Sequence, residues 1–230
     1  MLPRTICLTF ALFLSATAFS QLCEAYFPTD KGATLEYRHS DQINQTEVIL
    51  KFSLQSKTVE GGATVLNALE VVYDDGKPVM EIDHAYRCEE GIFYIDGKSV
   101  FSGPQLQQSG SFLEMTAEGD DLTIPTHPVV GQQLDDCNMK LVAKLPNVPI
   151  DFVLIGNIYN RKVEAFEAVT TPAGTFECVK ITEDVDSKMA FVNTTGKNKS
   201  WYAKNIGLVR QEVFDEKGKL LVRQELVKID

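Results

Sequence analysis

The sequence predicts an all-β protein, with a single strongly curved antiparallel sheet of hairpins that forms an open barrel or a sandwich. Three observations predict it. Apolar and polar residues alternate with a period of two over most of the chain after residue 20. Glycine-containing turns interrupt this alternation at short intervals. Helical periodicity is scarce, and at most one short helix is expected, at residues 104–109, where a proline comes first.

The first twenty residues are typical of a secretory signal peptide. Arg4 precedes an apolar run, and small residues follow it up to Ser20, which is the order of segments in such signals. The run is shorter than the roughly 20 apolar residues that span a bilayer. We therefore expect residues 1–20 to be a signal peptide, and we expect no transmembrane segment after its removal.

The rest of the chain, residues 21–230, is expected to be a single all-β domain that is exported to the periplasm or secreted. Cys23 follows the leader closely enough to raise lipidation as an alternative. Leu22 directly before it fits a lipidation signal poorly, so we interpret Cys23 as a thiol of the mature chain.

The first clear strands lie between residues 46 and 88. TEVILKFSL, residues 46–54, places apolar side chains on one face at every second position. VLNALEVVYDDGKPVMEIDHAYRC, residues 65–88, contains two such runs joined at Asp74–Lys77. Asp-Gly between alternating runs is a strong hairpin signal.

Further turns divide the remaining chain into about ten strands in all. They lie at residues 89–91, 96–97, 118–120 and 215–218. Because consecutive hairpins place sequential strands side by side, a meander is the expected order.

One stretch has the composition of a loop with a chemical role, but it has a simpler explanation. NRKVEAFEAVTTPAGTFECVKITEDV, residues 160–185, alternates on both sides of Pro172-Ala173-Gly174. Proline sets φ for the first turn position and glycine accepts a positive φ. We interpret the stretch as a hairpin.

Three stretches together resemble the TapB-like family of exported bacterial proteins, a family of unknown function. They are CEAYFPTDKGATLEYRHSD, the hairpin at residues 160–185, and KSWYAKNIGLVRQEVFDEKGKLLVRQELVKI. The resemblance covers essentially the whole mature chain. It implies a mostly β periplasmic or surface protein without an assigned enzyme activity, and it supplies no catalytic residue.

The charge balance argues against nucleic acid as a partner. The chain has 22 basic and 32 acidic side chains, for a formal net charge of −10. So acidic a chain is repelled by nucleic acids and by anionic membrane surfaces.

The cysteine count fits an oxidising compartment. Four cysteines remain after the leader, an even number that permits three pairings. We expect disulfides among them, with at least one of the two strand cysteines, Cys88 and Cys178, in a bridge; the other two are Cys23 and Cys137.

No catalytic, cofactor-binding or metal-binding residue is predicted. His39, His84 and His127 have no second histidine or cysteine at ligand spacing. No Gly-x-Ser-x-Gly nucleophile motif occurs. We therefore expect no cofactor, and we lean toward a protein that is not an enzyme.

Ligand binding is the hypothesis that remains, because a curved sheet has a hollow to fill. Its possible aromatic lining comprises Phe52, Phe93, Tyr94, Phe152, Phe166, Phe176, Phe191 and Trp201. Trp201 and Tyr202 are the candidate ligand or rim residues, since their polar tips need partners.

The favoured function is non-enzymatic binding of a small apolar ligand, a glycan or an envelope protein. The alternative is a cryptic envelope hydrolase, which a histidine touching a serine or cysteine would support. An assembly module is a third option, and it predicts a large apolar surface patch.

Overall fold

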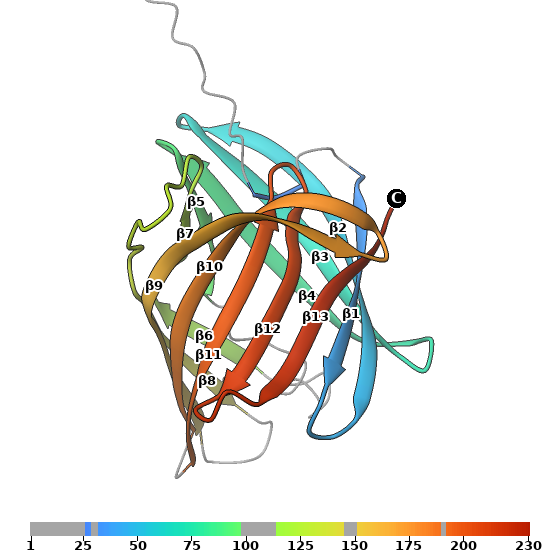
Figure 1. Ribbon diagram of the computed structural model, residues 1–230, viewed down its shortest axis with the longest axis vertical. Helices are drawn as coiled ribbons and strands as arrows, with labels where there is room; N and C mark the ends of the chain where they lie inside the picture. Colours follow the sequence, from blue (N-terminus) through green and yellow to red (C-terminus); the bar gives the residue numbers. More distant parts are fainter. Residues whose placement is uncertain (1–25, 29–31, 98–113, 145–150, 190–191) are drawn as a thin grey trace, which may run out of the picture.

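The computed structural model describes residues 26–28, 32–97, 114–144, 151–189 and 192–230, and its named elements are all strands of one antiparallel sheet (Figure 1). The thirteen strands are β1 (Thr34–Asp41), β2 (Thr46–Glu60), β3 (Ala63–Asp74), β4 (Lys77–Glu89), β5 (Ile92–Ile95), β6 (Glu114–Gly119), β7 (Leu122–Pro125), β8 (Cys137–Lys144), β9 (Asp151–Thr171), β10 (Gly174–Met189), β11 (Val192–Ala203), β12 (Gly207–Asp215) and β13 (Leu220–Ile229).

The predicted all-β class and the single antiparallel sheet are confirmed. The sheet bends around a core, but it is neither closed nor strongly curled. Of the two predicted forms, an open barrel and a sandwich, the structure has the open one. The predicted signal peptide and the helical turn at 104–109 lie outside the described residues. No helix in the described part of the chain is long and apolar enough to cross a membrane.

The strand order is a meander with one exchange. It runs β6-β8-β9-β10-β11-β12-β13-β1-β2-β3-β4-β5-β7, so the first strand pairs with the last. A strict meander would place β6 beside β5, but β5 pairs with β7 and β6 pairs with β8. The two edge strands are therefore neighbours in sequence, linked only by Asp120 and Asp121.

Glycine makes the exchange at this link possible. Gly119 has φ +144°, and a Cβ there would lie 2.1 Å from the carbonyl oxygen of Asn138. Next to it, the backbone N–H of Asp120 donates to that same oxygen at 2.9 Å. Only a residue without a side chain allows so close an approach.

The hairpins form where the turn residues predicted them. Asp75 and Gly76 both have positive φ, 47° and 73°, between the paired residues Asp74 and Lys77. This is the two-residue turn whose twist matches that of the flanking strands. The hairpin of β9 and β10 turns at Pro172 and Ala173, as expected.

The core lies on the inner face of the sheet and is continuous across it. Buried residues from strands that lie far apart in the sheet form one cluster. It includes Leu50 of β2, Phe93 of β5, Val163 of β9 and Leu226 of β13. Phe27, just before β1, packs into this cluster with its ring centroid 5.2 Å from that of Phe52. The two halves of the sheet thus share one core.

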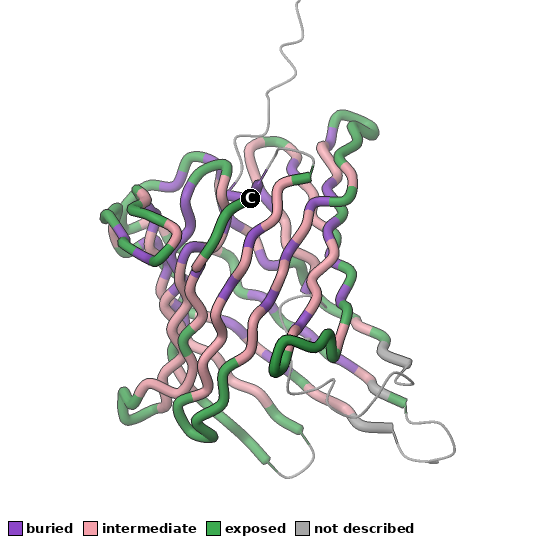
Figure 2. The backbone as a smooth tube through the Cα atoms, turned by 90° about the vertical axis from the view of Figure 1, so that its right-hand side faces the viewer, coloured by how far each residue is buried: buried purple, intermediate pink, exposed green. Residues whose placement is uncertain are grey.

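Burial decreases along the inner face, away from Phe27. On β1, Leu35 and Tyr37 are buried, whereas His39 is only half-buried. The same decline occurs from Leu226 to Gln224 on β13. Figure 2 shows the backbone passing from buried to exposed toward the turns. The inner face is therefore less buried toward the end where β1 turns into β2.

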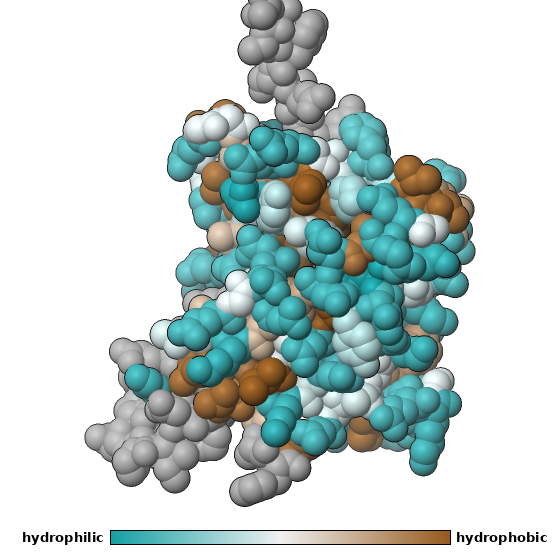
Figure 3. All heavy atoms as spheres, turned by 90° about the vertical axis from the view of Figure 1, so that its left-hand side faces the viewer, coloured by the Kyte–Doolittle hydropathy of each residue, from teal (hydrophilic) through white to brown (hydrophobic). Residues whose placement is uncertain are grey.

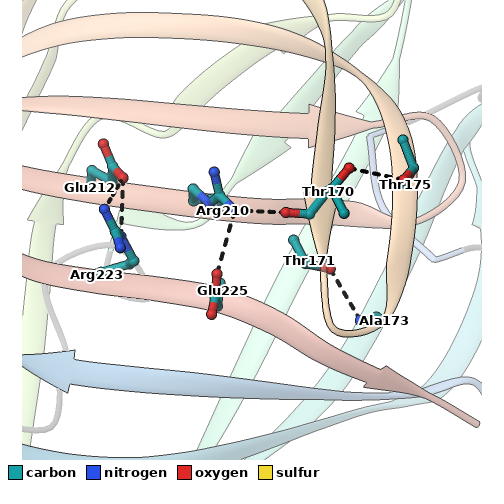
Figure 4. Close-up of polar contacts among 8 residues, drawn as sticks. All are labelled: Thr170, Thr171, Ala173, Thr175, Arg210, Glu212, Arg223 and Glu225. Atoms are coloured by element: carbon teal, nitrogen blue, oxygen red, sulfur yellow. Dashed lines mark hydrogen bonds and ion pairs between the residues drawn. The ribbon is translucent and has the colours of Figure 1, made fainter.

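The hairpin of β9 and β10 crosses over the outer face of the neighbouring strands (Figure 1). It covers a second, smaller cluster of buried residues: Val169, Cys178, Trp201, Ala203 and Val209. Arg210 of β12 fastens it, because its Nη2 donates to the carbonyl oxygen of Thr170 at 2.8 Å and lies 3.5 Å from Glu225 (Figure 4).

Candidate functional site

The inner face carries a group of polar side chains where an apolar core would be expected. His84 on β4 and Glu70 on β3 project from the strands that also contribute Ala68 and Ile82 to the core. Because side chains alternate along a strand, residues two positions apart share a face. Polar side chains thus interrupt the apolar inner face of two adjacent strands.

His84 is buried without a hydrogen bond. Its side chain is 7 % exposed, and neither Nδ1 nor Nε2 has a hydrogen-bond partner within the described part of the chain. A carboxylate oxygen of Glu70 lies 3.7 Å from Nε2, which is too far for a hydrogen bond. The imidazole centroid lies 6.0 Å from both neighbouring ring centroids, those of Phe52 and Tyr86.

Two tyrosines, Tyr37 and Tyr86, lie close enough to Glu70 to be affected by its charge, and Tyr202 lies close enough to both to affect them. Burial raises the pKa of Tyr86 well above its usual value, and the charge of Glu70 raises it further. The pKa of Tyr37 is raised by the same two causes. The pKa of Tyr202 is raised by burial and by Glu183. All three hydroxyls therefore stay neutral at ordinary pH and can donate or accept a hydrogen bond.

A second group of polar side chains forms a row across four other strands. Nδ1 of His39 lies 3.3 Å from Oε1 of Gln224, and Nε2 of Gln211 donates to Oγ of Ser200 at 3.3 Å. Their strands, β1, β13, β12 and β11, are consecutive in the sheet. This row lies at the level where burial of the inner face declines.

The one buried cation on the described inner face, Arg161, is held by the groups around it. Arg161 is 1 % exposed, and its Nε donates to Glu183 at 3.2 Å. Its other nitrogens donate to the carbonyl oxygens of Asp135 at 2.8 Å and Thr123 at 3.0 Å. The guanidinium is thus engaged by its own neighbours, and it fastens the edge strand β7 to β9.

The two candidate residues taken from the sequence lie on opposite faces. Trp201 is in the outer cluster beneath the β9–β10 hairpin, and its Nε1 donates to Glu167 at 2.6 Å. Tyr202 belongs to the inner core, near the polar group. The structure brings only Tyr202 to the site described here.

The aromatic residues that were predicted to line the hollow do not all lie on the inner face. Phe52 and Phe93 are buried on the inner face, whereas Phe166 is exposed. Phe191 and the side chain of Phe152 lie outside what the structure describes. Sequence reasoning missed His84 and Glu70, although a signal existed: both occupy inward positions in otherwise apolar alternating runs.

The cysteines do not form a site. Cys137 and Cys178 are buried free thiols, which is contrary to a bridge at Cys178. Cys88 is buried on β4. Cys23 lies outside the described residues.

The described residues give little support to the alternative functions, a hydrolase, a metal site or an assembly module. Hydrogen bonds of the histidines, within the described ranges, go to Gln224 and Thr126, and neither a serine nor a cysteine is among the partners. No three metal-ligating side chains gather there. Figure 3 shows one face on which hydrophilic residues separate several apolar patches.

A pocket of about 330 Å³ lies where β1 begins and β13 ends. It is lined by Pro28, Gly32, Ala33, Leu35, Asn205, Ile206, Ile229 and Asp230. None of these described residues is a buried polar side chain, so the pocket offers less chemistry than the inner face.

Known proteins share this fold. A "putative lipoprotein" from Parabacteroides distasonis matches with TM-score 0.78 and 22% identity, over 91% of this chain and 100% of that one. A "putative exported protein with YmcC-like fold" from Bacteroides fragilis matches with TM-score 0.75 and 22% identity, over 89% and 98%. No curated protein matches the sequence.

The sequence itself matches a family of unknown function, as the resemblance implied, although the TapB-like assignment is not the one supported. The model of the DUF3108-like family matches residues 30–226, which is most of the chain and nearly the whole described sheet. The chain therefore belongs to the DUF3108-like family.

Proposed function

We propose that this is an exported, non-enzymatic binding protein whose inner face holds a small molecule with an apolar body and a hydrogen-bonding head group. The observation that carries the proposal is the buried imidazole of His84, for whose two nitrogens the described residues supply no hydrogen bond. The ligand would contact the aromatic rings with its body and the imidazole with its head.

The energetic argument starts from the cost of burying a polar atom. A buried donor or acceptor without a partner costs roughly 1–3 kcal/mol. Buried polar groups in folded proteins are nearly always hydrogen-bonded. A phenylalanine at position 84 would fit the surrounding rings of Phe52 and Tyr86 without that cost. A polar group kept at a cost in stability is typical of a functional position.

Inward side chains that are not fully buried also support the proposal. Glu70 and Tyr86 are only partly buried although they point inward, and the polar row at His39 and Gln224 is half-buried. Small-molecule sites combine a mostly apolar wall with a few convergent polar groups. The inner face has both.

Export is supported by two independent observations. Residues 1–20 have the composition of a secretory signal. The two structures that share the fold are described as an exported protein and a lipoprotein. Those descriptions belong to those proteins, and we extend to this chain only the proposal of export.

The test compares His84→Phe with the matched variant His127→Phe, which changes an exposed histidine. Native mass spectrometry of wild-type protein, recovered from the envelope of its own host, should reveal a bound small molecule. His84→Phe should lose it, whereas His127→Phe should keep it. After refolding without ligand, His84→Phe should melt a few degrees higher than wild type, because it removes unpartnered polar atoms.

Three results would contradict the proposal. Wild-type protein from its own host carries no small molecule, or His84→Phe retains the molecule in full. A third is a lower melting temperature for ligand-free His84→Phe, which would mean that the fold itself satisfies the imidazole.

A further inference from the structure

We infer that the head group of the ligand is an uncharged or positively charged hydrogen-bond donor, an alcohol or an amine, and not a carboxylate or a phosphate. This inference rests on the proposed function, since it concerns the same inner site. It follows from which polar atoms remain available around His84 and from the sign of the charge there.

The available atoms favour a head group that can donate. A neutral imidazole has one donor nitrogen and one acceptor nitrogen, and both are unpartnered in His84. The carboxylate of Glu70, 3.7 Å from Nε2, can only accept. An alcohol both donates and accepts, and an ammonium donates. A carboxylate or a phosphate dianion only accepts, so it makes no hydrogen bond to the acceptor nitrogen or to the carboxylate of Glu70.

The charge of the site works in the same direction. Glu70 is the acid beside the imidazole, and Asp96 is close enough to Tyr86 to raise the pKa of its hydroxyl. Arg161 is the one buried cation of the described residues, and its donors bind Glu183 and two backbone carbonyls. An anionic head group would therefore enter a negative field without an uncommitted buried cation to balance it.

The aromatic groups near the imidazole have an affinity for both permitted head groups. Tyr86 stacks on His84 with an interplanar angle of 28°, and Phe27 packs against Tyr86 with centroids 4.2 Å apart. An ammonium over an aromatic face is attracted by the negative face of the ring. An alcohol can exchange hydrogen bonds with the neutral hydroxyls of the tyrosines.

The experiment uses three probes of equal chain length that differ only in the head group: decanol, decylamine and decanoate. Binding to ligand-free wild-type protein is measured by calorimetry below the micellar concentration of each probe. Decanol and decylamine should bind at least about ten-fold more tightly than decanoate, because only decanoate meets the field of Glu70 with like charge.

The variant Glu70→Gln tests the cause of this preference. Glu118→Gln is the matched control, because Glu118 is 78 % exposed on β6 and the change in net charge is the same. Glu70→Gln should improve decanoate binding about ten-fold relative to decanol. Glu118→Gln should leave the ratio unchanged.

The outcomes separate the two proposals. Decanoate binding as tightly as decanol to wild type, or a ratio that Glu70→Gln does not change, overturns the inference about the head group but leaves a binding protein. An anionic compound co-purifying with the wild type would do the same. If none of the probes binds and nothing co-purifies, the proposed function itself fails.

Discussion

Arg161 and Glu183 form a buried ion pair that holds distant parts of the chain together. Arg161 lies two residues before the buried Val163, and Glu183 two residues after the buried Ile181, so period two alone places both charges on the inner face. Nothing in the sequence shows that they meet. The positive φ of Asn160 and a register shift between β9 and β10 set their relative position, and such local irregularities are not visible in an alternation pattern.

Arg161→Met should lower the free energy of unfolding by about 3–5 kcal/mol, because it leaves Glu183 buried without its cation. Chemical denaturation monitored by circular dichroism measures this. The double variant Arg161→Met/Glu183→Leu should be less destabilised than the single one, since no uncompensated charge remains. Arg38→Met, in an exposed pair with Glu47 at 3.8 Å, should cost less than about 1 kcal/mol. Equal losses for Arg161 and Arg38 would refute this explanation.

At the scale of elements, the β9–β10 hairpin is a structural arm. Its two strands follow the alternation and the Pro-Ala-Gly turn that the sequence displays, so the hairpin could be predicted. Its position over the outer face could not, because that depends on long-range contacts such as the hydrogen bond from Trp201 to Glu167. The exchange of β6 and β7 was missed for the same reason: a turn predicts where strands end, and not which strands pair.

Trp201→Ala should destabilise the protein by about 3–5 kcal/mol, because it removes the largest side chain beneath the arm and leaves a cavity. Trp201→Phe keeps a ring and loses the N–H to Glu167, so it should cost less. Urea titration of both variants checks the order. An unchanged midpoint for Trp201→Ala would instead favour a role for this side chain in binding.

At the scale of the whole molecule, the link of Asp120 to Asp121 joins the two edge strands of the open sheet, β6 and β7. Arg161 on β9 holds β7 through its hydrogen bond to Thr123. The buried thiols contribute no bridge, and burial raises the pKa of Cys137 to about 11 and that of Cys178 to about 12. By elimination, Cys23 and Cys88 are the pair that we expect to be joined in the oxidised, mature protein.

Thiol titration tests this assignment of two free thiols and one disulfide. Both free thiols should react slowly with a thiol reagent at pH 8 in the folded protein, because the reactive thiolate is disfavoured. Unfolded, unreduced mature protein should expose two thiols, and four would mean that no bridge exists.

The pKa values of Cys137 and Cys178 in the folded protein lie above the unfolded value of about 8.5. Their contribution to stability is therefore full below that pH and should fall as the pH rises through 11 to 12.

The pairing of the first strand with the last has a practical consequence. Thr34 and Asp230 exchange two backbone hydrogen bonds, of 3.0 and 2.9 Å. Both strands therefore leave the sheet at the end where Leu35 is buried, opposite the half-exposed level of His39. A reporter or an affinity tag fused after Asp230 would sit beside Thr34 at this end of the sheet, away from the half-buried row at His39 and Gln224.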